Sequence, residues 1–344
     1  MKKYKVGIVG IGAVGTELVK VLRQRKFPAS EIRILARSER DEEIAGETFH
    51  VRPAAPENFE GLDFALFAGT EGSKGASQVF GWEAVRRGVI VIDNGDDFRM
   101  DPKVPLVIPE INPEALDGHQ GFISNPNCST IIALMALGPL HQAAGIRRFI
   151  ATTFQSVSGT GRAAIAELEQ QVRDYVAGKP CKAETYPHQI AFNVLPQIGG
   201  GKPDVPGFTS EEVKMRNETR KILGAPRIRV SSTCVRVPVF YAHSEALNIE
   251  FKRDLSPEEA REILAKTPGV RVVDDLAKSV YPMPLRVAGG DDVWVGRIRR
   301  DESVKNGLVL WVSGDNIRKG AAQNAVQIAE VMIQRGLVEK WKNR

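Results

Sequence analysis

The chain has 344 residues, which is long for one hydrophobic core and suits two domains. Hydrophobic residues make up 42% and charged residues 26%, a composition that excludes a disordered or fibrous chain. Lys and Arg total 47 against 42 Asp and Glu, with no basic stripe or known reading motif, which argues against a nucleic-acid partner.

The three cysteines, Cys128, Cys181 and Cys234, lie far apart and form no metal-ligand spacing. Their odd number and wide spacing indicate neither a disulfide framework nor a metal site. The first residues show no cleavage-site pattern, and no run of about 18 apolar residues occurs that would suit a membrane span. We therefore expect a cytoplasmic protein with no membrane contact and no metal.

The first predicted element is an apolar strand over 6–9, followed by a glycine-rich turn and a helical spacing of apolar residues. A strand, a GxGxxG turn and a helix in this order are typical of a dinucleotide-binding βα unit. The helix N-terminus would then face the phosphates of the cofactor. A turn that serves only packing is the alternative. The predicted binding turn comprises Gly10, Ile11, Gly12, Ala13, Val14 and Gly15.

The second predicted strand, over 31–36, ends in Arg37, Ser38 and Arg40 rather than in an acid for the ribose hydroxyls. Two guanidinium groups and a hydroxyl suit a 2′-phosphate, so the pattern favours NADP as the cofactor. Ordinary surface arginines in a solvated turn remain the alternative.

Further apolar runs at 64–67, 89–92 and 106–108 alternate with helical or turn-rich stretches, as in a doubly wound parallel sheet. The loop over 68–73 follows one of these strands, at the edge where ligands of such sheets bind. We expect this loop to lie on the cofactor side.

Cys128 follows a turn and opens an apolar helix. The positive end of a helix favours the thiolate, which is the form that attacks a carbonyl. A buried packing cysteine is the alternative for this residue alone. A nucleophilic cysteine directly after a nicotinamide-binding domain points to acyl transfer joined to hydride transfer.

The remainder of the chain predicts strands mixed with helices over 161–177 and 256–266 and a long loop over 178–207. This pattern indicates an α+β domain for catalysis and dimerisation. We expect a Rossmann-like NADP-binding domain over 1–130, a second domain over 131–315, and a C-terminal helical segment over 316–344 that packs back on the first.

Several long motifs occur in one order, and together they make the chain resemble the bacterial aspartate-semialdehyde dehydrogenase family over almost its whole length. The motifs are Gly-Ala-Val-Gly at 12–15, Ser-Asn-Pro-Asn-Cys-Ser-Thr at 124–130, Phe-Gln-Ser-Val-Ser-Gly-Thr-Gly at 154–161, Phe-Thr-Ser-Glu-Glu-Val-Lys-Met at 208–215, Thr-Cys-Val-Arg-Val-Pro at 233–238, Ala-His-Ser-Glu at 242–245 and Gly-Asp-Asn-Ile-Arg-Lys-Gly at 314–320.

The resemblance implies the NADPH-dependent conversion of L-aspartyl 4-phosphate to L-aspartate 4-semialdehyde and phosphate, in lysine, methionine and threonine biosynthesis. Cys128 would form the thioester and His243 would be the acid–base partner, since imidazole titrates near working pH. The resemblance also implies a homodimer or homotetramer.

The resemblance assigns the remaining roles residue by residue. Gln155 would orient the acyl group, and Asn127 would help to bind the phosphate. Binding of the substrate's charged groups is implied for Arg99, Glu211, Lys214 and Arg236, and contacts with the cofactor are implied for Ser158, Gly159 and Asn316.

Other functions remain open at this stage. Asp96 and Asp97 place two acids beside the expected phosphate site, where they would either point to solvent or fit a different acyl substrate. A related acyl-phosphate or acyl-CoA reductase is therefore one alternative, although Glu211 and Arg236 are both present. A non-catalytic relative is another, although such a relative would be expected to lack Cys128 or His243.

Overall fold

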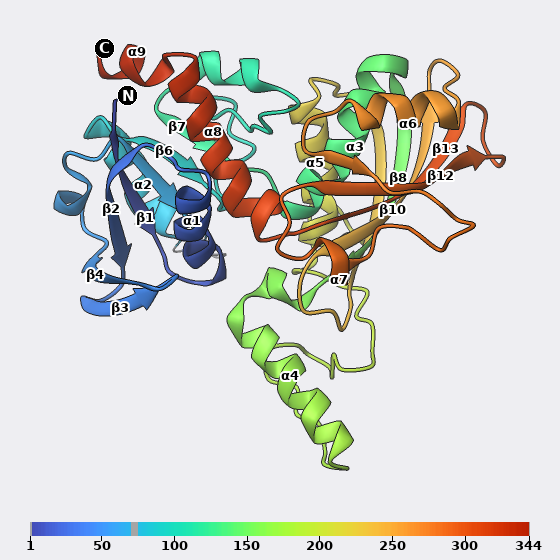
Figure 1. Cartoon of the computed structure of the whole chain (residues 1–344), viewed down its shortest axis with the longest axis horizontal. Coiled ribbons are helices and arrows are strands. Elements are labelled where there is room, and N and C mark those ends of the chain that lie inside the picture. The colour runs from blue at the N-terminus through green and yellow to red at the C-terminus, as the bar shows by residue number, and fades with distance from the viewer. Residues whose placement is uncertain (1, 70–74, 344) are drawn as a thin grey trace. The chain divides into compact units, whose positions relative to one another are not determined.

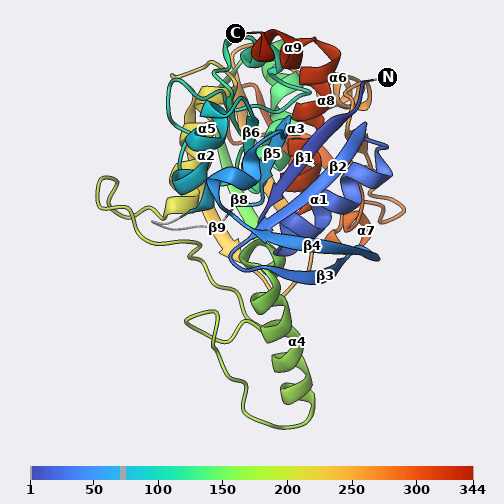
Figure 2. The same cartoon turned by 90° about the vertical axis from the view of Figure 1, so that its left-hand side faces the viewer.

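The computed structural model describes residues 2–69 and 75–343. The chain divides into two compact units, each with its own sheet (Figures 1 and 2). The first unit comprises Met1–Asn127 and Ala321–Arg344, and the second comprises Cys128–Gly320. None of the described helices is both long and apolar enough to cross a membrane.

The first unit has a sheet in the order β3-β4-β2-β1-β5-β6-β7, in which β3 alone, among the described strands, runs antiparallel to its neighbour. The next strands along the chain, β2 to β4, lie on one side of the central strand β1, and β5 to β7 lie on its other side, so the strand order reverses at β1. The strands are β1 (Tyr4–Val9), β2 (Ala29–Ala36), β3 (Arg40–Ile44), β4 (Glu47–Pro53), β5 (Phe64–Phe67), β6 (Ile90–Asp93) and β7 (Phe122–Ser124).

Both faces of this sheet are buried, which explains why β5 and the first three residues of β6 are apolar without alternation. Side chains of α1 (Ala13–Gln24) and α8 (Gln323–Gln334) pack in the cluster on one face, with α9 (Leu337–Lys342) at its end. Those of α2 (Ala76–Arg86) pack in the cluster on the other face. The short helices η1 (Pro56–Phe59) and η2 (Pro113–Gly118) complete the described elements of this unit.

One predicted strand of the first unit is wrong. The apolar run over 106–108 forms only an isolated bridge between Leu106 and Ser124. Pro105 and Pro109 flank this run. Because proline has no backbone N–H, it cannot donate to a strand ladder, and the pairing does not extend.

The second unit has a mixed sheet in the order β11-β12-β13-β10-β8-β9. Helices α3, α5 and α6 pack against it, and α3 is apolar on all sides because it is buried over most of its length. The strands are β8 (Ile146–Gln155), β9 (Arg229–Arg236), β10 (His243–Phe251), β11 (Val270–Val272), β12 (Val293–Asp301) and β13 (Gly307–Gly314). The helices are α3 (Cys128–Ala144), η3 (Val157–Thr160), α4 (Arg162–Val176), α5 (Ser210–Ile222), α6 (Pro257–Ala265) and α7 (Pro284–Val287), and a π-helical turn follows at Arg318–Ala322.

Helix α4 and the loop that follows it project away from the sheet of the second unit (Figures 1 and 2). The sequence predicted this helix over 161–177 and a long loop over 178–207, and both are confirmed. A small apolar cluster that includes Leu168, Ile190 and Leu195 fixes the loop to the helix. The side chain of Gln171, on α4, accepts hydrogen bonds from the backbone N–H groups of Ile190 and Ala191 in the loop.

Candidate active site

The glycine-rich turn of the first unit has the form that a dinucleotide phosphate needs. Gly10 follows β1 with φ of 95°, a conformation that favours glycine, and a β-carbon at Gly15 would overlap the carbonyl oxygen of Gly10. By contrast, a β-carbon at Gly12 would meet no atom within 4 Å. The turn is thus tightly packed where the helix meets the strand, at Gly10 and Gly15, and has free space at Gly12, just before α1. It lies at the carboxyl end of β1, where the strand order reverses and such sheets bind ligands.

The three residues predicted to contact a 2′-phosphate are all exposed, and they lie between the end of β2 and the first residue of β3. Arg40 donates to both the hydroxyl and the carbonyl oxygen of Ser38, at 3.0 Å each. Its Nε donates to Glu42. Arg40 and Ser38 therefore lie together, with Arg37 next to them in the chain, as a group that can receive an anion.

The predicted phosphate residue Arg99 is buried and binds backbone groups of its own unit. Its Nε donates to the Asn125 carbonyl at 2.9 Å and its Nη2 to the Asn94 carbonyl at 2.7 Å. Arg99 thereby ties the loop after β6 to the segment before Asn127, which is also buried.

Of the two acids beside Arg99, Asp97 has hydrogen-bond partners on α2. Asp97 accepts hydrogen bonds from Gln78 at 2.7 Å and from Ser77 at 3.3 Å, so its carboxylate binds the first turn of α2. The loop predicted on the cofactor side, 68–73, lies mostly outside the described residues.

Asp93, at the end of β6, is a buried acid in the same region. It accepts the Gly95 N–H at 2.8 Å, and its other oxygen has no hydrogen-bond partner among the described residues. Burial raises the pKa of Asp93 from 3.8 to about 6, although Gly95, Ser77 and the charge of Arg99 oppose this shift. The carboxyl therefore titrates near pH 6.

We expect the change in the free energy of unfolding caused by Asp93→Asn to be more favourable at pH 8 than at pH 4. The folded chain binds the Asp93 proton more tightly than the unfolded chain, so the wild type loses stability as pH rises from about 4 to about 6. The full shift corresponds to at most about 3 kcal/mol. Denaturant unfolding of both proteins at the two pH values measures the difference, and a difference that is the same at both would contradict this prediction.

In the second unit, Cys128 is the first residue of α3, as the sequence predicted. Its side chain is partly exposed. Gly320 packs against it so closely that a β-carbon there would lie 2.9 Å from the Cys128 Cβ. The thiol thus sits at the positive end of a long helix, where the thiolate is favoured.

Four of the predicted residues gather on one face of the second sheet. Gln155 is paired with Arg236 in the register of β8 and β9, and its amide donates to Glu211 of α5 at 3.1 Å. Glu211 also lies 3.8 Å from the ammonium of Lys214. Helix α5 begins with a capping box, and Glu211 lies in its first turn. The helix packs against β9.

His243, at the start of β10, belongs to the same group. A β-carbon at Gly159 would lie 3.0 Å from Arg236 Nη1 and 3.3 Å from His243 Nε2, so the η3 turn packs against both side chains. His243 is fully buried. Burial first, and the charge of Arg236 second, hold the pKa of His243 well below its ordinary value. The imidazole is therefore neutral.

Sequence reasoning missed two buried residues of this group. Ser156 donates its backbone N–H to His243 Nδ1 at 3.0 Å, and its carbonyl accepts from Arg236 at 2.7 Å. Glu245 is fully buried, with no hydrogen-bond partner for either oxygen among the described residues. Burial, and then the charge of Glu211, raise the pKa of Glu245 well above its ordinary value. A signal for Glu245 was its place two residues after His243, which puts both on one face of a strand.

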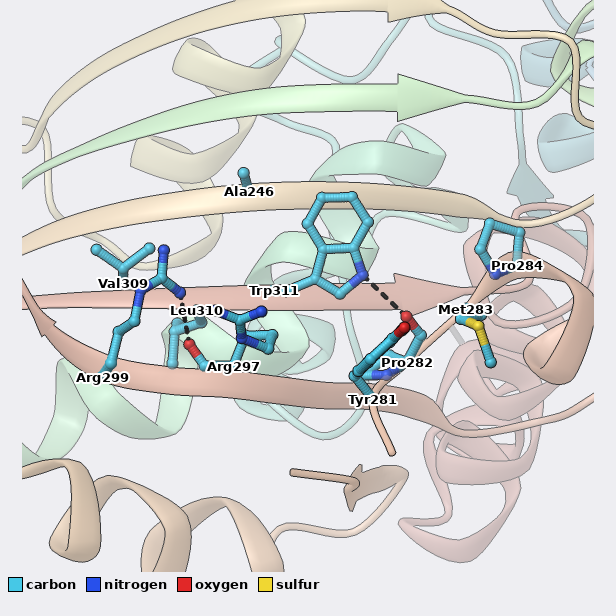
Figure 3. Close-up of a pocket in the computed structure, with 10 residues that line it drawn as sticks. All are labelled: Ala246, Tyr281, Pro282, Met283, Pro284, Arg297, Arg299, Val309, Leu310 and Trp311. Carbon is cyan, nitrogen blue, oxygen red and sulfur yellow. Dashed lines mark hydrogen bonds between the residues drawn. The ribbon is translucent and has the colours of Figure 1, made fainter. Parts of the chain in front are cut away.

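A cavity of about 340 Å³ opens on the opposite face of this sheet (Figure 3). Its wall includes Ala246, which follows Glu245 and so points to the other side of β10. The Trp311 indole N–H donates to the Pro282 carbonyl at 3.0 Å across one end. None of the predicted site residues lines this cavity. Among the described residues, no group of three or more His, Cys, Asp and Glu could hold a metal ion.

Comparisons with known proteins cover nearly the whole chain. The family described as semialdehyde dehydrogenase, NAD binding domain matches residues 5–119, and the family described as semialdehyde dehydrogenase, dimerisation domain matches residues 137–319. The aspartate-semialdehyde dehydrogenase of Aquifex aeolicus is 49% identical over 97% of this chain and 99% of its own length. That of Bacillus subtilis is 43% identical over 97% and 98%. The chain belongs to the aspartate-semialdehyde dehydrogenase family.

Solved structures of aspartate-semialdehyde dehydrogenases also match. Enzyme II of Vibrio cholerae has a TM-score of 0.91 at 43% identity, covering 97% of this chain and 99% of that one. The Candida albicans enzyme, solved with NADP, has a TM-score of 0.71 at 25% identity, over 99% of each chain.

These findings confirm the predicted family and fold class. A doubly wound unit that matches an NAD binding domain precedes an α+β unit that matches a dimerisation domain. A nicotinamide cofactor and a dimer are therefore properties of the aspartate-semialdehyde dehydrogenase family that extend to this chain.

Proposed function

We propose that the chain catalyses the NADPH-dependent reduction of L-aspartyl 4-phosphate to L-aspartate 4-semialdehyde and phosphate, through a thioester on Cys128. The observation that carries this proposal is the group of His243, Arg236, Gln155 and Glu211 on one sheet face, in the unit that Cys128 begins. These residues offer a cation and an anion for an amino acid's two charged groups.

Cys128 acts as the nucleophile in this reaction. Its thiolate attacks the acyl carbon, the carbon–oxygen bond to phosphate breaks, and inorganic phosphate leaves. The cofactor supplies the hydride that reduces the thioester. The carbon–sulfur bond then breaks, which releases the aldehyde and restores the thiolate. His243 is the acid–base partner, which forms a hydrogen bond and exchanges protons at the reacting oxygen.

The charged groups of the substrate have separate partners. Arg236 binds the α-carboxylate through its planar guanidinium, and Glu211 binds the α-ammonium. Lys214, Arg99 and Asn127 bind the phosphate, and Gln155 orients the acyl group. The hydrogen bond from Gln155 to Glu211 supports this division, because it fixes the carboxylate beside the acyl position.

The cofactor is NADP, held by the residues from Gly10 to Gly15 and by the exposed group of Arg37, Ser38 and Arg40. Their fit rests on the open space at Gly12 and on the Arg40–Ser38 contact. Ser158, Gly159 and Asn316 are the second unit's contacts with the nicotinamide. The working assembly is a homodimer or a homotetramer.

The test of this function is phosphate-dependent reduction of NADP by the purified protein with L-aspartate 4-semialdehyde. We expect NADPH to form only when phosphate and the aldehyde are both present. Turnover with a longer or a CoA-linked acyl substrate, and none with this aldehyde, would refute the substrate assignment and leave the family intact.

Removing the arginines near Ser38 is expected to reverse the cofactor preference. In Arg37→Ala/Arg40→Ala, loss of two charged hydrogen bonds to the 2′-phosphate should raise the KM for NADP about 100-fold. The KM for NAD should change less than about threefold, because NAD has no 2′-phosphate. Initial rates with both cofactors measure this, with the exposed Arg86→Ala as a matched surface control. An equal loss for NAD and NADP would contradict the prediction.

A further inference from the structure

The reaction proposed above leaves Asn125, three residues before Cys128, without a role. This asparagine is fully buried and directly follows β7. Its backbone N–H donates to the carbonyl of Asp93 at 2.7 Å, and its own carbonyl accepts from Arg99 Nε at 2.9 Å. The backbone of Asn125 therefore connects the end of β6 with the arginine that we propose for phosphate.

The side chain of Asn125 is the middle member of a hydrogen-bonded chain of three asparagine amides, which we call the amide chain. Asn324 of α8 donates to its Oδ1 at 2.7 Å, and its Nδ2 donates to the side-chain oxygen of Asn94 at 3.0 Å. At one end, the Asn324 amide also donates to the Val107 carbonyl at 3.0 Å. At the other end, the Asn94 amide donates to the Phe67 carbonyl at 2.8 Å. These two carbonyls fix the direction of the amide chain, because a reversed amide would place two donors or two acceptors face to face.

The amide chain lies close to both points at which the polypeptide passes from one unit to the other. The first unit ends its long segment at Asn127 and resumes at Ala321. Asn125 lies two residues before the first of these points, and Asn324 lies three residues after the second. The Asn125 amide is also 3.4 Å from the carbonyl of Pro126, whose peptide leads into Asn127. One buried hydrogen bond thus joins the two connecting segments beside a residue that we propose for phosphate.

We propose that Asn125 and Asn324 are positioning residues for the phosphate group of the acyl substrate. They act through Arg99 and Asn127, so this inference rests on the proposed function. Arg99 donates to the backbone carbonyls of Asn125 and Asn94, so two members of the amide chain anchor its guanidinium. Donors that are already in place bind an anion more tightly, because binding then orders no side chain. Loss of the amide chain therefore weakens phosphate binding and leaves cofactor binding unchanged.

The first experiment measures the KM for inorganic phosphate in the phosphate-dependent reduction of NADP. We expect Asn125→Ala to raise this KM about 10- to 100-fold, because a displaced binding group costs this much. The KM for NADP should stay within about twofold of the wild type. Asn324→Ala breaks the same hydrogen bond from its other end and should raise the KM for phosphate about 10-fold. In the double variant the increase should be smaller than the product of the two single increases, since both remove one connection.

Asn112→Ala is the matched control, because a merely structural asparagine should not affect phosphate. Asn112 is also buried in the first unit, and its side chain makes hydrogen bonds with the backbones of Ile108 and Leu106. Its substitution should lower the melting temperature but keep the KM for phosphate within about twofold. A wild-type KM for phosphate in both Asn125→Ala and Asn324→Ala would overturn the positioning role. An equal increase in Asn112→Ala would overturn it as well.

Calorimetry of phosphate binding tests the inference without turnover. Inorganic phosphate should bind the NADP complex of the wild type, and that of Asn324→Ala about 10-fold more weakly. Asn324→Ala keeps the bond between Asn125 and Asn94, so it decides the question even where Asn125→Ala does not fold. Equal affinities, or no binding by either protein, would overturn the positioning role. A wild type that binds phosphate without phosphate-dependent turnover would instead refute the proposed function, while weaker binding by the variant would still support the positioning role.

Discussion

Cys128→Ala is expected to lose all measurable phosphate-dependent NADP reduction, a fall in kcat of at least about 10⁴-fold. Alanine has no atom that can form the thioester, and no other cysteine can replace it. Cys234 is fully buried, and Cys181 lies in the loop after α4, with its thiol donating to the Gln171 carbonyl. Initial-rate assays at saturating substrate give the size of the loss.

Structural damage would not account for such a loss. The close contact of Gly320 is with the Cα and Cβ of Cys128, and both atoms remain in alanine. We therefore expect unchanged NADP binding and a melting temperature within a few degrees of the wild type. Cys181→Ala serves as the matched control and should keep full activity. More than one-hundredth of wild-type turnover in Cys128→Ala would contradict a covalent mechanism. Mass spectrometry of the wild type mixed with substrate should show the acyl adduct on the peptide that carries Cys128.

The first unit could be predicted well from the sequence because its signals are local. The GxGxxG turn has a strand before it and a helix after it within about twenty residues, and the apolar periodicity changes between them. The start of α3 at Cys128 was likewise visible as a turn that ends in an apolar run. The error at Leu106 arose because an apolar run shows burial but does not show whether the backbone can pair.

The second unit could not be predicted in the same way because its site depends on contacts between distant parts of the chain. Ser156 and His243 are 87 residues apart, and Ser158 and Asn316 are 158 apart. No periodicity links such residues, and the family resemblance named His243 and Asn316 without showing what joins them. The resemblance assigned Arg99 to phosphate but did not show that Arg99 also binds the backbone carbonyls of Asn94 and Asn125.

Arg236 has two separable effects, and its substitution is expected to show both. Its guanidinium is the proposed partner of the substrate carboxylate, and its charge lowers the pKa of His243. In Arg236→Leu, loss of a bidentate charged pair of about 3–4 kcal/mol should raise the KM for aspartate semialdehyde about 100- to 1000-fold. Initial rates over a range of aldehyde concentrations measure this change.

The pH profile of kcat separates the second effect from the first. A lowered pKa keeps His243 neutral well below pH 6.5, so the wild type should remain active at acid pH. Without the positive charge the pKa of His243 rises, and the acid limb of the profile should move to higher pH in Arg236→Leu. Arg236→Lys keeps a positive charge but has no planar fork. It should therefore keep the wild-type acid limb while its KM rises about tenfold.

The comparison of Arg236→Leu with Arg236→Lys also tests whether the two side chains work as one group. Arg236 Nη1 binds the Ser156 carbonyl, and the N–H of the same Ser156 binds His243. If that connection positions the imidazole, kcat should fall in both variants, because a lysine cannot reproduce the fork that reaches Ser156 and a carboxylate together. A raised KM with unchanged kcat and an unchanged acid limb in both variants would restrict Arg236 to substrate binding alone. The orientation of His243 would then depend on its hydrogen bond with Ser156 without help from the arginine.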